Sequence, residues 1–350
     1  MGSEAMGSGT MGRLWRRAVH KGAAVDRTTV DMSCRVGPVV LPNPVMTASG
    51  TAGHGAELAA YFDLSRLGAI VVKSLSAEPW EGNPAPRLLP VAGGMLNSVG
   101  LHNAGIDAWL AHDLPALAKA GARVVVSVWG RSPEDYAEVG RRLSLGLARA
   151  HAHARSCVVA VEANISCPNV EDRHRMFSHS AEGTSAALGA LGGALEATGL
   201  PIWAKLSPNV TDLVAIAKAA LVSGAGAVTL VNTLMGLALD PLTGAARLGG
   251  GGGGLSGPAL HPVAVRAVYE CRRALPEIPI VGVGGVSTGY DAAELLAAGA
   301  DAVQVGTASF VDPRAPLRVA EELRAWCASH GLASVDQIGG RRRPQAGNFG

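Results

Sequence analysis

A cysteine follows an apolar run in this chain and is surrounded by amide and hydroxyl side chains. Residues 158–161 are apolar and largely β-branched, as in a buried parallel strand, and they lead into the polar segment 162–169, EANISCPN. Pro168 lacks an amide hydrogen and biases Cys167 away from helical backbone angles, so we expect the thiol on a shaped loop. A single cysteine is more often an inert, half-buried thiol. The polar neighbours that favour a functional site instead are Asn164, Ser166 and Asn169.

Two lysines interrupt apolar runs in a chain that strongly prefers arginine. Lys73 lies in the run 69–75 and Lys205 in the run 202–206. An unpaired ammonium group inside such a run is costly, so we expect both lysines to meet an anion or a cofactor. The alternative for each is a lysine that reaches solvent along an apolar surface or forms a salt bridge.

Glycine-rich turns follow the last two strand-like runs, at residues 282–289 and 306–307. In a barrel, the loops after the seventh and eighth strands commonly hold a phosphate group through backbone amides. Two such clusters on consecutive strands favour a phosphate cradle over a pair of tight turns. The six-glycine run 249–254 is different, and we expect it to be a mobile segment.

Eight short apolar runs alternate with longer segments of helical composition, such as residues 133–145, and these elements must position the candidate residues. The alternation matches a (β/α)₈ barrel, in which functional residues lie on loops at the carboxyl ends of the strands. A doubly wound sheet is the competing architecture, but its glycine-rich turn normally follows the first strand rather than the seventh. The expected strands are 45–49, 69–75, 124–129, 158–164, 202–206, 227–233, 280–285 and 302–307.

The composition suits one large α/β domain. The chain has 350 residues, of which 48% are hydrophobic and 17% charged, and its net charge is +2. This near-neutral balance gives no electrostatic footprint for nucleic acid, and the basic cluster 341–343 indicates a solvated tail. No stretch is long and apolar enough to cross a bilayer, and the N-terminus lacks the hydrophobic core of a signal peptide. We expect a cytoplasmic protein that binds neither nucleic acid nor membrane.

We divide the chain into three parts. Residues 1–28 are rich in Gly, Ser and Arg and contain several methionines, so we expect a flexible leader or a misassigned start. Residues 29–333 should form the catalytic barrel, and residues 334–350 a C-terminal tail. The five cysteines are scattered and have no CxxC spacing. This favours a reducing compartment and argues against a zinc site or an iron–sulfur cluster held by this chain alone.

Ten short motifs follow one another along the chain. They are ASG (48–50), VVKSLS (71–76), NPAPR (83–87), GMLNSVGLHNAG (94–105), EANISCPN (162–169), KLSPN (205–209), NTLMG (232–236), GLSGP (254–258), GVGGV (282–286) and GTA (306–308). Taken in this order, the motifs resemble class 1 dihydroorotate dehydrogenase, and the match runs over residues 33–315. The motifs NTLMG and GLSGP favour subclass 1B, whose catalytic subunit pairs with a separate iron–sulfur flavoprotein subunit.

The resemblance implies a barrel that holds FMN at the carboxyl ends of its strands. The FMN phosphate would lie on Gly284, Gly285, Gly306 and Thr307. The rest of the flavin would be lined by Ser49, Lys73, Ser74, Ser127, Asn164, Lys205, Val231 and Gly257, with serine at 127 where subclass 1B usually has asparagine. The substrate would be held by Lys73, Asn97, Ser98, Val99, Gly100, Leu101, Asn164, Asn169, Asn232 and Thr233. Asparagine suits a planar ring of amide groups because it offers both donors and acceptors.

The implied reaction is the oxidation of (S)-dihydroorotate to orotate in de novo pyrimidine biosynthesis, an oxidoreductase reaction on a CH–CH group. Cys167, as thiolate, would remove a proton from C5 of the substrate while hydride leaves C6 for N5 of FMN, with Lys73 between flavin and substrate. A free thiol with a pKa of about 8.5 is mostly protonated at neutral pH. The site must therefore lower that pKa or work best in mild alkali.

Two other functions stay open at this point. Loop 170–183, which we expect to be the lid over the substrate, is unusually rich in charge, so a related barrel acting on another dihydropyrimidine-like ring or in secondary metabolism is one alternative. A non-catalytic barrel that binds flavin or another ligand is the alternative from a different class, but it would have no need of Cys167. A phosphate-binding aldolase barrel would use a Schiff-base lysine and would not need the SCPN turn.

The resemblance also implies partners for this chain. A homodimer is expected, and an electron-transfer subunit carrying an iron–sulfur cluster and FAD would pass electrons to NAD. Fumarate and quinone are the other acceptors used in the family. The N-terminus lacks the apolar helices expected for quinone access.

Overall fold

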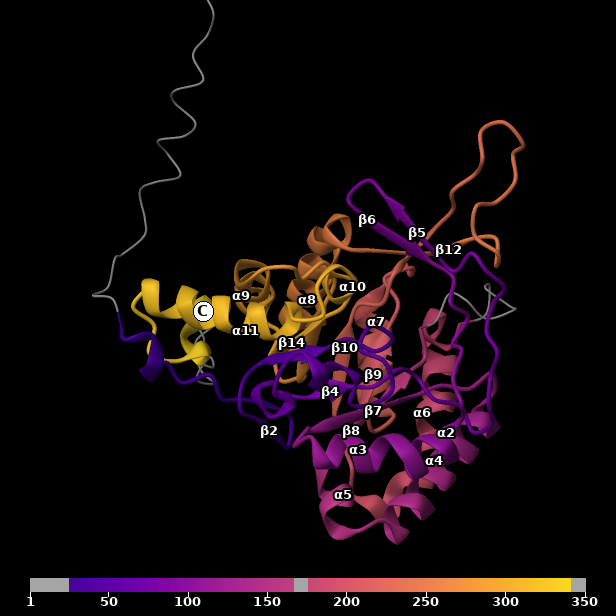
Figure 1. The fold of residues 1–350 in the computed structure, drawn as a ribbon, viewed down its shortest axis with the longest axis horizontal. Helices are drawn as coiled ribbons and strands as arrows, with labels where there is room; N and C mark the ends of the chain where they lie inside the picture. The colour runs from indigo at the N-terminus through magenta and orange to yellow at the C-terminus, as the bar shows by residue number, and fades with distance from the viewer. Residues whose placement is uncertain (1–24, 167–175, 341–350) are drawn as a thin grey trace, which may run out of the picture.

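The computed structural model describes residues 25–166 and 176–340, in which eight parallel strands curl into a barrel (Figure 1). The strand order is β3-β14-β13-β10-β9-β8-β7-β4. The end strands β3 and β4 meet, because the Gly68 N–H donates to the Val45 carbonyl at 2.8 Å and the Thr47 N–H to the Ala69 carbonyl at 3.3 Å. The expected (β/α)₈ architecture is confirmed. The strands are β3 (Val45–Thr47), β4 (Ile70–Val71), β7 (Val124–Val128), β8 (Val158–Asn164), β9 (Ile202–Leu206), β10 (Ala227–Leu230), β13 (Ile280–Val283) and β14 (Ala302–Val305).

Several strands end earlier than the sequence predicts, and the difference creates the loops of the barrel rim. The expected strand 69–75 leaves the ladder after Val71, and the expected strand 227–233 leaves it after Leu230. β8 and β9 have the predicted bounds. The residues beyond these strand ends include Lys73, Ser74, Asn232 and Thr233, and at the carboxyl end of a barrel strand such polar residues can face the site.

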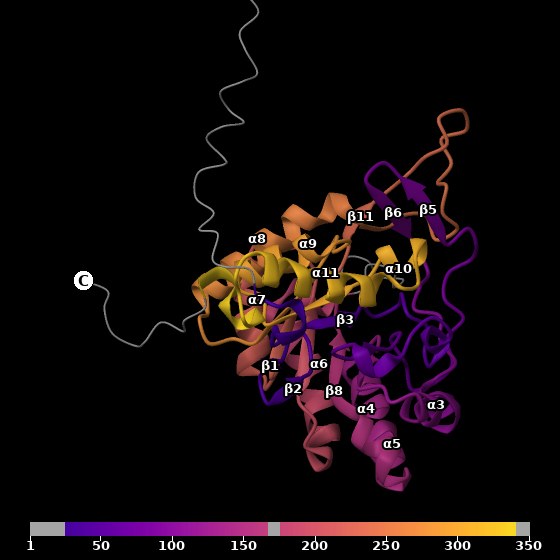
Figure 2. The same ribbon diagram turned by 60° about the vertical axis from the view of Figure 1, so that its left-hand side comes forward.

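Helices cover the outside of the barrel between successive strands (Figures 1 and 2). The expected helix 133–145 is observed as α4 (Pro133–Arg149), which begins where Ser132 accepts a hydrogen bond from the Asp135 amide. Among the described residues, no helix is long and apolar enough to span a bilayer. The other helices are α2 (Ile106–Ala108), η4 (Trp109–Asp113), α3 (Leu114–Lys119), α5 (Ala152–Cys157), α6 (Ala181–Leu195), α7 (Leu213–Val222), α8 (His261–Ala274), α9 (Gly289–Ala298), α10 (Ala308–Val311) and α11 (Ala315–Ser329). Single turns of 3₁₀ helix are η1 (Arg27–Thr29), η2 (Glu57–Ala60), η3 (Leu64–Arg66), η5 (Phe177–His179), η6 (Glu196–Thr198) and η7 (Pro258–Leu260).

An antiparallel hairpin closes the amino end of the barrel. Its strands β1 (Cys34–Val36) and β2 (Val39–Leu41) alternate buried and exposed residues, as expected when one face packs on a core. The buried face joins inward-pointing barrel residues such as Met46, Trp203 and Val281 in one apolar cluster. This cluster fills the lower half of the barrel interior.

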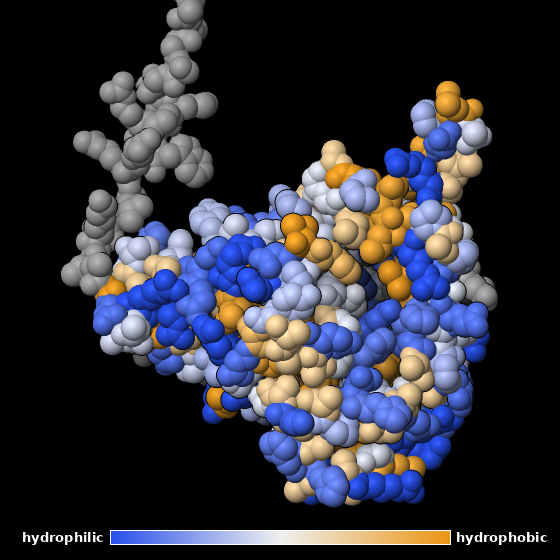
Figure 3. Space-filling model, viewed as in Figure 1, coloured by the Kyte–Doolittle hydropathy of each residue, from blue (hydrophilic) through white to orange (hydrophobic). Residues whose placement is uncertain are grey.

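A second, four-stranded antiparallel sheet lies at the carboxyl end of the barrel, opposite the hairpin (Figure 2). Its order is β11-β12-β6-β5, which the sequence does not suggest because its strands are short and come from two distant segments. The segment between β11 and β12 projects from the body of the molecule and carries apolar residues among polar ones (Figure 3). The strands are β5 (Leu88–Val91), β6 (Gly94–Asn97), β11 (Leu234–Gly236) and β12 (Gly253–Ser256).

The six-glycine run 249–254 is not the mobile segment that we expected, because its end forms β12 between β6 and β11. A Cβ atom at Gly253 would collide with the Asn97 carbonyl, and one at Gly254 would collide with the Thr233 side chain. Gly249 and Gly250 are crowded in the same way by the chain around residues 83–85 and by Ser98. Glycine is required here for close packing of the backbone rather than for flexibility.

The packed unit is longer at both ends than the expected range 29–333. At the start, the Val25 N–H donates to the Ala328 carbonyl at 3.2 Å. At the end, residues 335–340 form η8 (Val335–Gly340), and Val335 and Ile338 are buried in the core. Residues 334–340, which we assigned to the tail, therefore belong to the domain, since these two apolar side chains pack against the barrel helices.

Candidate active site

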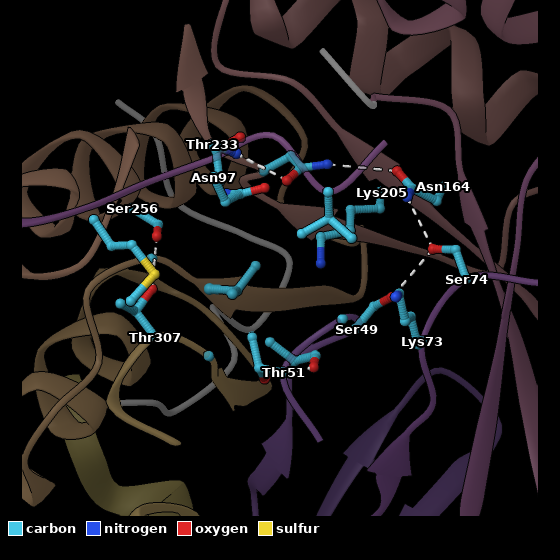
Figure 4. Close-up of a pocket in the computed structure, with 18 of the residues that line it drawn as sticks. Ser49, Thr51, Lys73, Ser74, Asn97, Asn164, Lys205, Thr233, Ser256 and Thr307 are labelled. Atoms are coloured by element: carbon cyan, nitrogen blue, oxygen red, sulfur yellow. Dashed lines mark hydrogen bonds between the residues drawn. The ribbon is translucent and has the colours of Figure 1, made fainter. Parts of the chain in front are cut away.

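A cavity, open at one side, lies at the carboxyl ends of the barrel strands below the second sheet (Figure 4). Most of the residues that the sequence singled out lie on its wall, although they come from every part of the chain. They are Ser49, Lys73, Ser74, Asn97, Val99, Gly100, Leu101, Asn164, Lys205, Val231, Asn232, Thr233, Gly284, Gly285, Gly306 and Thr307.

Five predicted site residues are not on the described wall. Ser98 is fully buried and its hydroxyl accepts a hydrogen bond from Asn83 at 2.9 Å. Ser127 is fully buried behind the wall, and Gly257 lies beside Gly94 with φ +100°. Cys167 and Asn169 lie outside the described residues, as do residues 170–175 of the expected lid 170–183.

Three hydroxyl groups and one carboxamide form a connected cluster on one side of the cavity. The Ser49 Oγ lies 3.1 Å from the Ser74 Oγ and 3.1 Å from the Ser127 Oγ, and the last two atoms are 2.9 Å apart. Asn164 Nδ2 donates to the Ser74 Oγ at 2.9 Å (Figure 4). Ser127 therefore acts from behind, as a support for Ser49 and Ser74. The hydrogen bond to Ser74 fixes the Asn164 carboxamide, whose oxygen Oδ1 is then turned away from Ser74.

A second amide group meets that oxygen. Asn232 Nδ2 lies 3.4 Å from Asn164 Oδ1, and it donates to the Ser166 carbonyl at 3.1 Å and to the Ser166 Oγ at 3.0 Å. The Asn232 oxygen accepts from the Thr233 N–H at 2.9 Å. These bonds hold the end of β8 against the wall of the cavity. Ser166 is the residue directly before Cys167 in the chain.

The loop that follows β6 closes the cavity from above. Asn97 Nδ2 donates to the Gly254 carbonyl at 3.2 Å, which ties the end of β6 to β12. Leu101 has φ +63°, which is uncommon for a residue with a Cβ atom. Its carbonyl accepts from Asn103 Nδ2 at 2.8 Å, and Trp80 Nε1 donates to the Gly100 carbonyl at 2.9 Å. The loop is held in one shape by bonds outside the cavity, so its cavity-facing groups stay available.

Lys73 is a half-buried cation that has no ion-pair partner among the described residues. Burial lowers the pKa of Lys73 below its ordinary value of 10.5, and the nearby positive charge of Arg87 lowers it further. An ammonium group held in this way gains most from an anionic ligand in the cavity. The prediction that Lys73 faces an anion therefore agrees with its surroundings.

Lys205 does have a partner, in contrast to Lys73. Its Nζ lies 3.7 Å from Oε1 of Glu162, and both side chains are almost completely buried. Lys205 also reaches the cavity wall. Lys205 therefore forms the salt bridge that we considered as an alternative and also lines the cavity. Its partner Glu162 lies next to the site, and the sequence analysis did not identify it as a site residue.

The glycine turns after β13 and β14 allow the backbone to approach the cavity closely. Gly285 has φ +69°, and a Cβ atom there would lie 2.7 Å from the Cβ of His261 and 2.8 Å from the Gly257 carbonyl. His261 Nδ1 lies 2.8 Å from the carbonyl oxygen of Gly284. The turn is therefore packed from behind by α8, while its front faces the cavity, as a phosphate cradle requires.

The structure adds wall residues that the sequence analysis passed over. Met95 and Phe310 supply apolar surface, and Ser256 accepts a hydrogen bond from the Thr307 hydroxyl at 2.8 Å. Met95 and Ser256 lie inside the motifs GMLN and GLSGP, so the motifs themselves were the signal that could have identified them. Phe310 lies three residues after Thr307 and had no such signal.

The described cysteines away from the cavity are poor nucleophiles. Burial raises the pKa of Cys157 and Cys327 to about 11 and that of Cys271 to about 12, so almost no thiolate exists at neutral pH. In the parts of the chain that the structure describes, no group of three or more His, Cys, Asp or Glu side chains would hold a metal ion.

The chain is similar to known proteins over most of its length. Residues 32–326 match the family model described as dihydroorotate dehydrogenase. The chain is 45% identical over 308 residues to "Dihydroorotate dehydrogenase B (NAD(+)), catalytic subunit" of Geobacter sp. (strain M21), covering 88% of this chain and 97% of that relative. The protein of the same name from Alkaliphilus metalliredigens (strain QYMF) is 42% identical over 313 residues, covering 89% of this chain and 99% of that relative.

A solved structure supports the architecture. A crystal structure of DHODH in complex with ferulenol, from Eimeria tenella, superposes with a TM-score of 0.70 and covers 90% of this chain and 89% of that chain. At 23% sequence identity this similarity shows the fold alone. The family match and the relatives extend over nearly the whole barrel. The chain therefore belongs to the dihydroorotate dehydrogenase family.

Proposed function

We propose that this chain is an FMN-dependent oxidoreductase that converts (S)-dihydroorotate to orotate in de novo pyrimidine biosynthesis. The observation that carries the proposal is the convergence of Lys73, Asn97, Asn164 and Asn232 from four separate segments on one cavity, in a chain of this family. Dihydroorotate dehydrogenases related to this chain are FMN-binding flavoproteins. Three amide side chains beside a cation suit a ring of amide groups that bears a carboxylate.

The cavity fits FMN on structural grounds. At Gly284 and Gly285 a Cβ atom would meet α8 at 2.7 Å, so only glycine lets the turn present its backbone to a phosphate there. Gly306 lies against Ala48 on the neighbouring loop. Ser49, Ser74 and Lys205 would line the ring system. FMN would supply the acceptor for the hydride, which carries both electrons that leave the substrate.

The residues of this chain would bind and orient the substrate. Lys73 would hold its carboxylate, because the ammonium group is short of anionic partners. Asn97, Asn164 and Asn232 would fix the plane of the ring, and the hydrogen bonds among the last two and Ser74 hold them ready before binding. Such preorganisation reduces the entropy that binding must overcome.

Cys167 would remove the proton from C5. The described segment 25–166 ends with Ser166, which accepts hydrogen bonds from the cavity residue Asn232. Cys167, the next residue along the chain, would therefore be a suitable base for a ligand held by Asn232. The remaining described cysteines are poor thiolates or lie far along the chain from the cavity loops. The predicted roles of Cys167 and Asn169 stay proposals.

An anaerobic titration of the purified, FMN-loaded protein with L-dihydroorotate tests the function. Stoichiometric bleaching of the oxidised-flavin absorption is expected. Cys167→Ala should bind FMN but lose nearly all bleaching, Cys167→Ser should keep some activity, and the matched control Cys157→Ala should bleach like the parent. A yellow protein that dihydroorotate does not bleach would bind FMN but act on a different ring compound. A colourless protein that FMN cannot reconstitute would favour the ligand-binding barrel.

The relatives are named as catalytic subunits, which implies a partner subunit. We propose a homodimer of this chain that joins a second subunit carrying FAD and an iron–sulfur cluster and passes electrons to NAD. The scattered cysteines, which have no CxxC spacing, support a cluster on another chain. We also propose a cytoplasmic location, because Cys157, Cys271 and Cys327 are thiols rather than disulfides.

A further inference from the structure

A carboxylate is completely buried inside the barrel, directly below the cavity. Ala160, Glu162 and Asn164 alternate along β8 and therefore point to the same side, into the barrel. Ala160 belongs to the apolar cluster of the barrel floor, and Asn164 lines the cavity. Glu162 lies between these two layers and is 0% exposed. The layer that separates the core from the site thus contains a negative charge.

Only one oxygen of this carboxylate has hydrogen-bond donors among the described residues. Oε2 accepts from Gln304 Nε2 at 2.8 Å and from Thr229 Oγ1 at 3.1 Å. Oε1 has no hydrogen-bond partner in that part of the chain and lies 3.7 Å from Lys205 Nζ. A buried carboxylate is costly unless a cation compensates it, and the same holds for a buried ammonium. Glu162 and Lys205 therefore stabilise each other in the barrel interior.

Lys205 links this charge to the cavity. It is 5% exposed, and the surface that it keeps lies on the cavity wall, where we propose that the flavin binds. The Lys205 ammonium group would therefore interact with Glu162 on one side and with the ligand in the cavity on the other. A negative charge at 3.7 Å screens part of its field, since interactions between charges are strong where water is excluded.

We propose that Glu162 is a positioning residue that aims Lys205 Nζ at the cofactor and screens part of its charge, and so limits how strongly the site favours negative charge on the flavin. Thr229 and Gln304 hold the carboxylate in place. This inference rests on the proposed binding of FMN and does not depend on the identity of the substrate. It assigns a function to a carboxylate that never contacts substrate or cofactor.

Sulfite titration of the FMN-loaded protein measures this effect without turnover. Sulfite adds reversibly to oxidised flavin through its sulfur lone pair, so the ring system gains a negative charge and its visible absorption disappears. The dissociation constant for sulfite therefore reports positive charge near the flavin. In Glu162→Gln the ammonium of Lys205 is no longer screened, and we expect sulfite to bind at least tenfold more tightly than to the parent.

The double mutant shows whether Glu162 acts through Lys205. Lys205→Met should weaken sulfite binding at least tenfold, and Glu162→Gln should have no further effect in that background. Thr229→Val is the matched control, because it removes a hydrogen bond to the carboxylate but keeps both charges, and its sulfite affinity should stay within threefold of the parent. Unchanged or weaker sulfite binding by Glu162→Gln, or an equal effect with and without Lys205, would overturn the proposal.

A second variant keeps the test decisive if Glu162→Gln does not fold. Glu162→Asp retains the charge but withdraws it by one methylene group from Lys205, so a smaller tightening of sulfite binding is expected, and parental affinity would overturn the proposal. The experiment also distinguishes failure of the proposed function from failure of the role proposed for Glu162. An FMN-loaded protein that dihydroorotate does not bleach, but that shows the predicted sulfite pattern, would refute the substrate and keep the role of Glu162.

Discussion

The amide side chains of the cavity are held in one arrangement by their neighbours. The Ser74 hydroxyl accepts a hydrogen bond from Asn164 Nδ2, and Asn232 Nδ2 lies beside Asn164 Oδ1. An asparagine fixed in this way presents a defined pattern of donors and acceptors to a ligand. Ser127 belongs to the same cluster through Ser49 and Ser74. Ser127 thus supports the cavity wall from behind.

Lys73 carries a stability cost that ligand binding can offset. Because its pKa is lowered in the folded protein, the folded state binds fewer protons than the unfolded state between the lowered pKa and the ordinary value of 10.5. Stability therefore rises with pH across that interval, as the cost of keeping the ammonium charged disappears. The cost is fully present at neutral pH.

Replacement of Lys73 by methionine removes that cost. We expect Lys73→Met to melt at a higher temperature than the parent at pH 7 when both are free of FMN, and the difference should shrink as the pH approaches 10. Flavin bleaching by dihydroorotate should be lost. Thermal denaturation followed by circular dichroism checks this, with exposed Lys218→Met as the control that changes little at either pH. A lower melting temperature for Lys73→Met at pH 7 would contradict the expectation.

At the scale of elements, we propose that the turn after β13 holds the cofactor phosphate. It is packed against α8 so closely that a Cβ atom at Gly285 has no room, and His261 lies directly behind it. The turn and the helix form one unit in which small residues bring the backbone up to the cavity. The unit depends on contacts between segments that are more than twenty residues apart in the chain.

A substitution at Gly285 tests this unit. Gly285→Ala should lower the affinity for FMN at least tenfold, because its Cβ atom would push the turn away from α8. Gly199→Ala is the matched control: Gly199 has φ +66°, close to the +69° of Gly285, but a Cβ atom added there would have no neighbour within 4 Å. Both variants lose about 1–2 kcal/mol to backbone strain, and only Gly285→Ala should change FMN binding, measured by fluorescence quenching. Equal FMN affinity of the two variants would remove the turn from the site.

At the scale of the whole molecule, the candidate site lies at the carboxyl end of the barrel. The β1–β2 hairpin and its apolar cluster fill the amino end, and the second sheet with its projecting segment surrounds the carboxyl end (Figure 2). Leu237, Leu239 and Leu242 on the projecting segment are largely exposed.

The proposed partner subunit makes a prediction about electron transfer. The purified chain with FMN should bleach with dihydroorotate and should reduce a dye such as dichloroindophenol, but it should not reduce NAD, because NAD reduction would require the second subunit. Steady-state assays with each acceptor, together with light scattering to measure the oligomeric state, check this. Co-purification from the native host should bring a second, iron-containing chain. A homodimer that reduces NAD without another chain would refute the two-subunit proposal.

The sequence by itself determined the barrel and most of the cavity wall. Strands buried on both faces need continuous apolar runs, so the eight runs are visible without tertiary information, and β8 and β9 have the predicted bounds. In a parallel barrel all strand carboxyl ends face the same way. Residues near the carboxyl ends of these runs, such as Lys73, Asn164 and Asn232, could therefore be assigned to one site from their order in the chain.

Only the tertiary structure decided which of these groups contact one another. Glu162 and Lys205 lie more than forty residues apart, and no local pattern shows that their side chains meet at 3.7 Å inside the barrel. Gly254 lies beside Thr233 because β12 pairs with β6 and β11, so a run of glycines that suggests mobility from its composition is a tightly packed strand. Composition and periodicity report local preferences, whereas ion pairs and close backbone approaches depend on segments that meet only after folding.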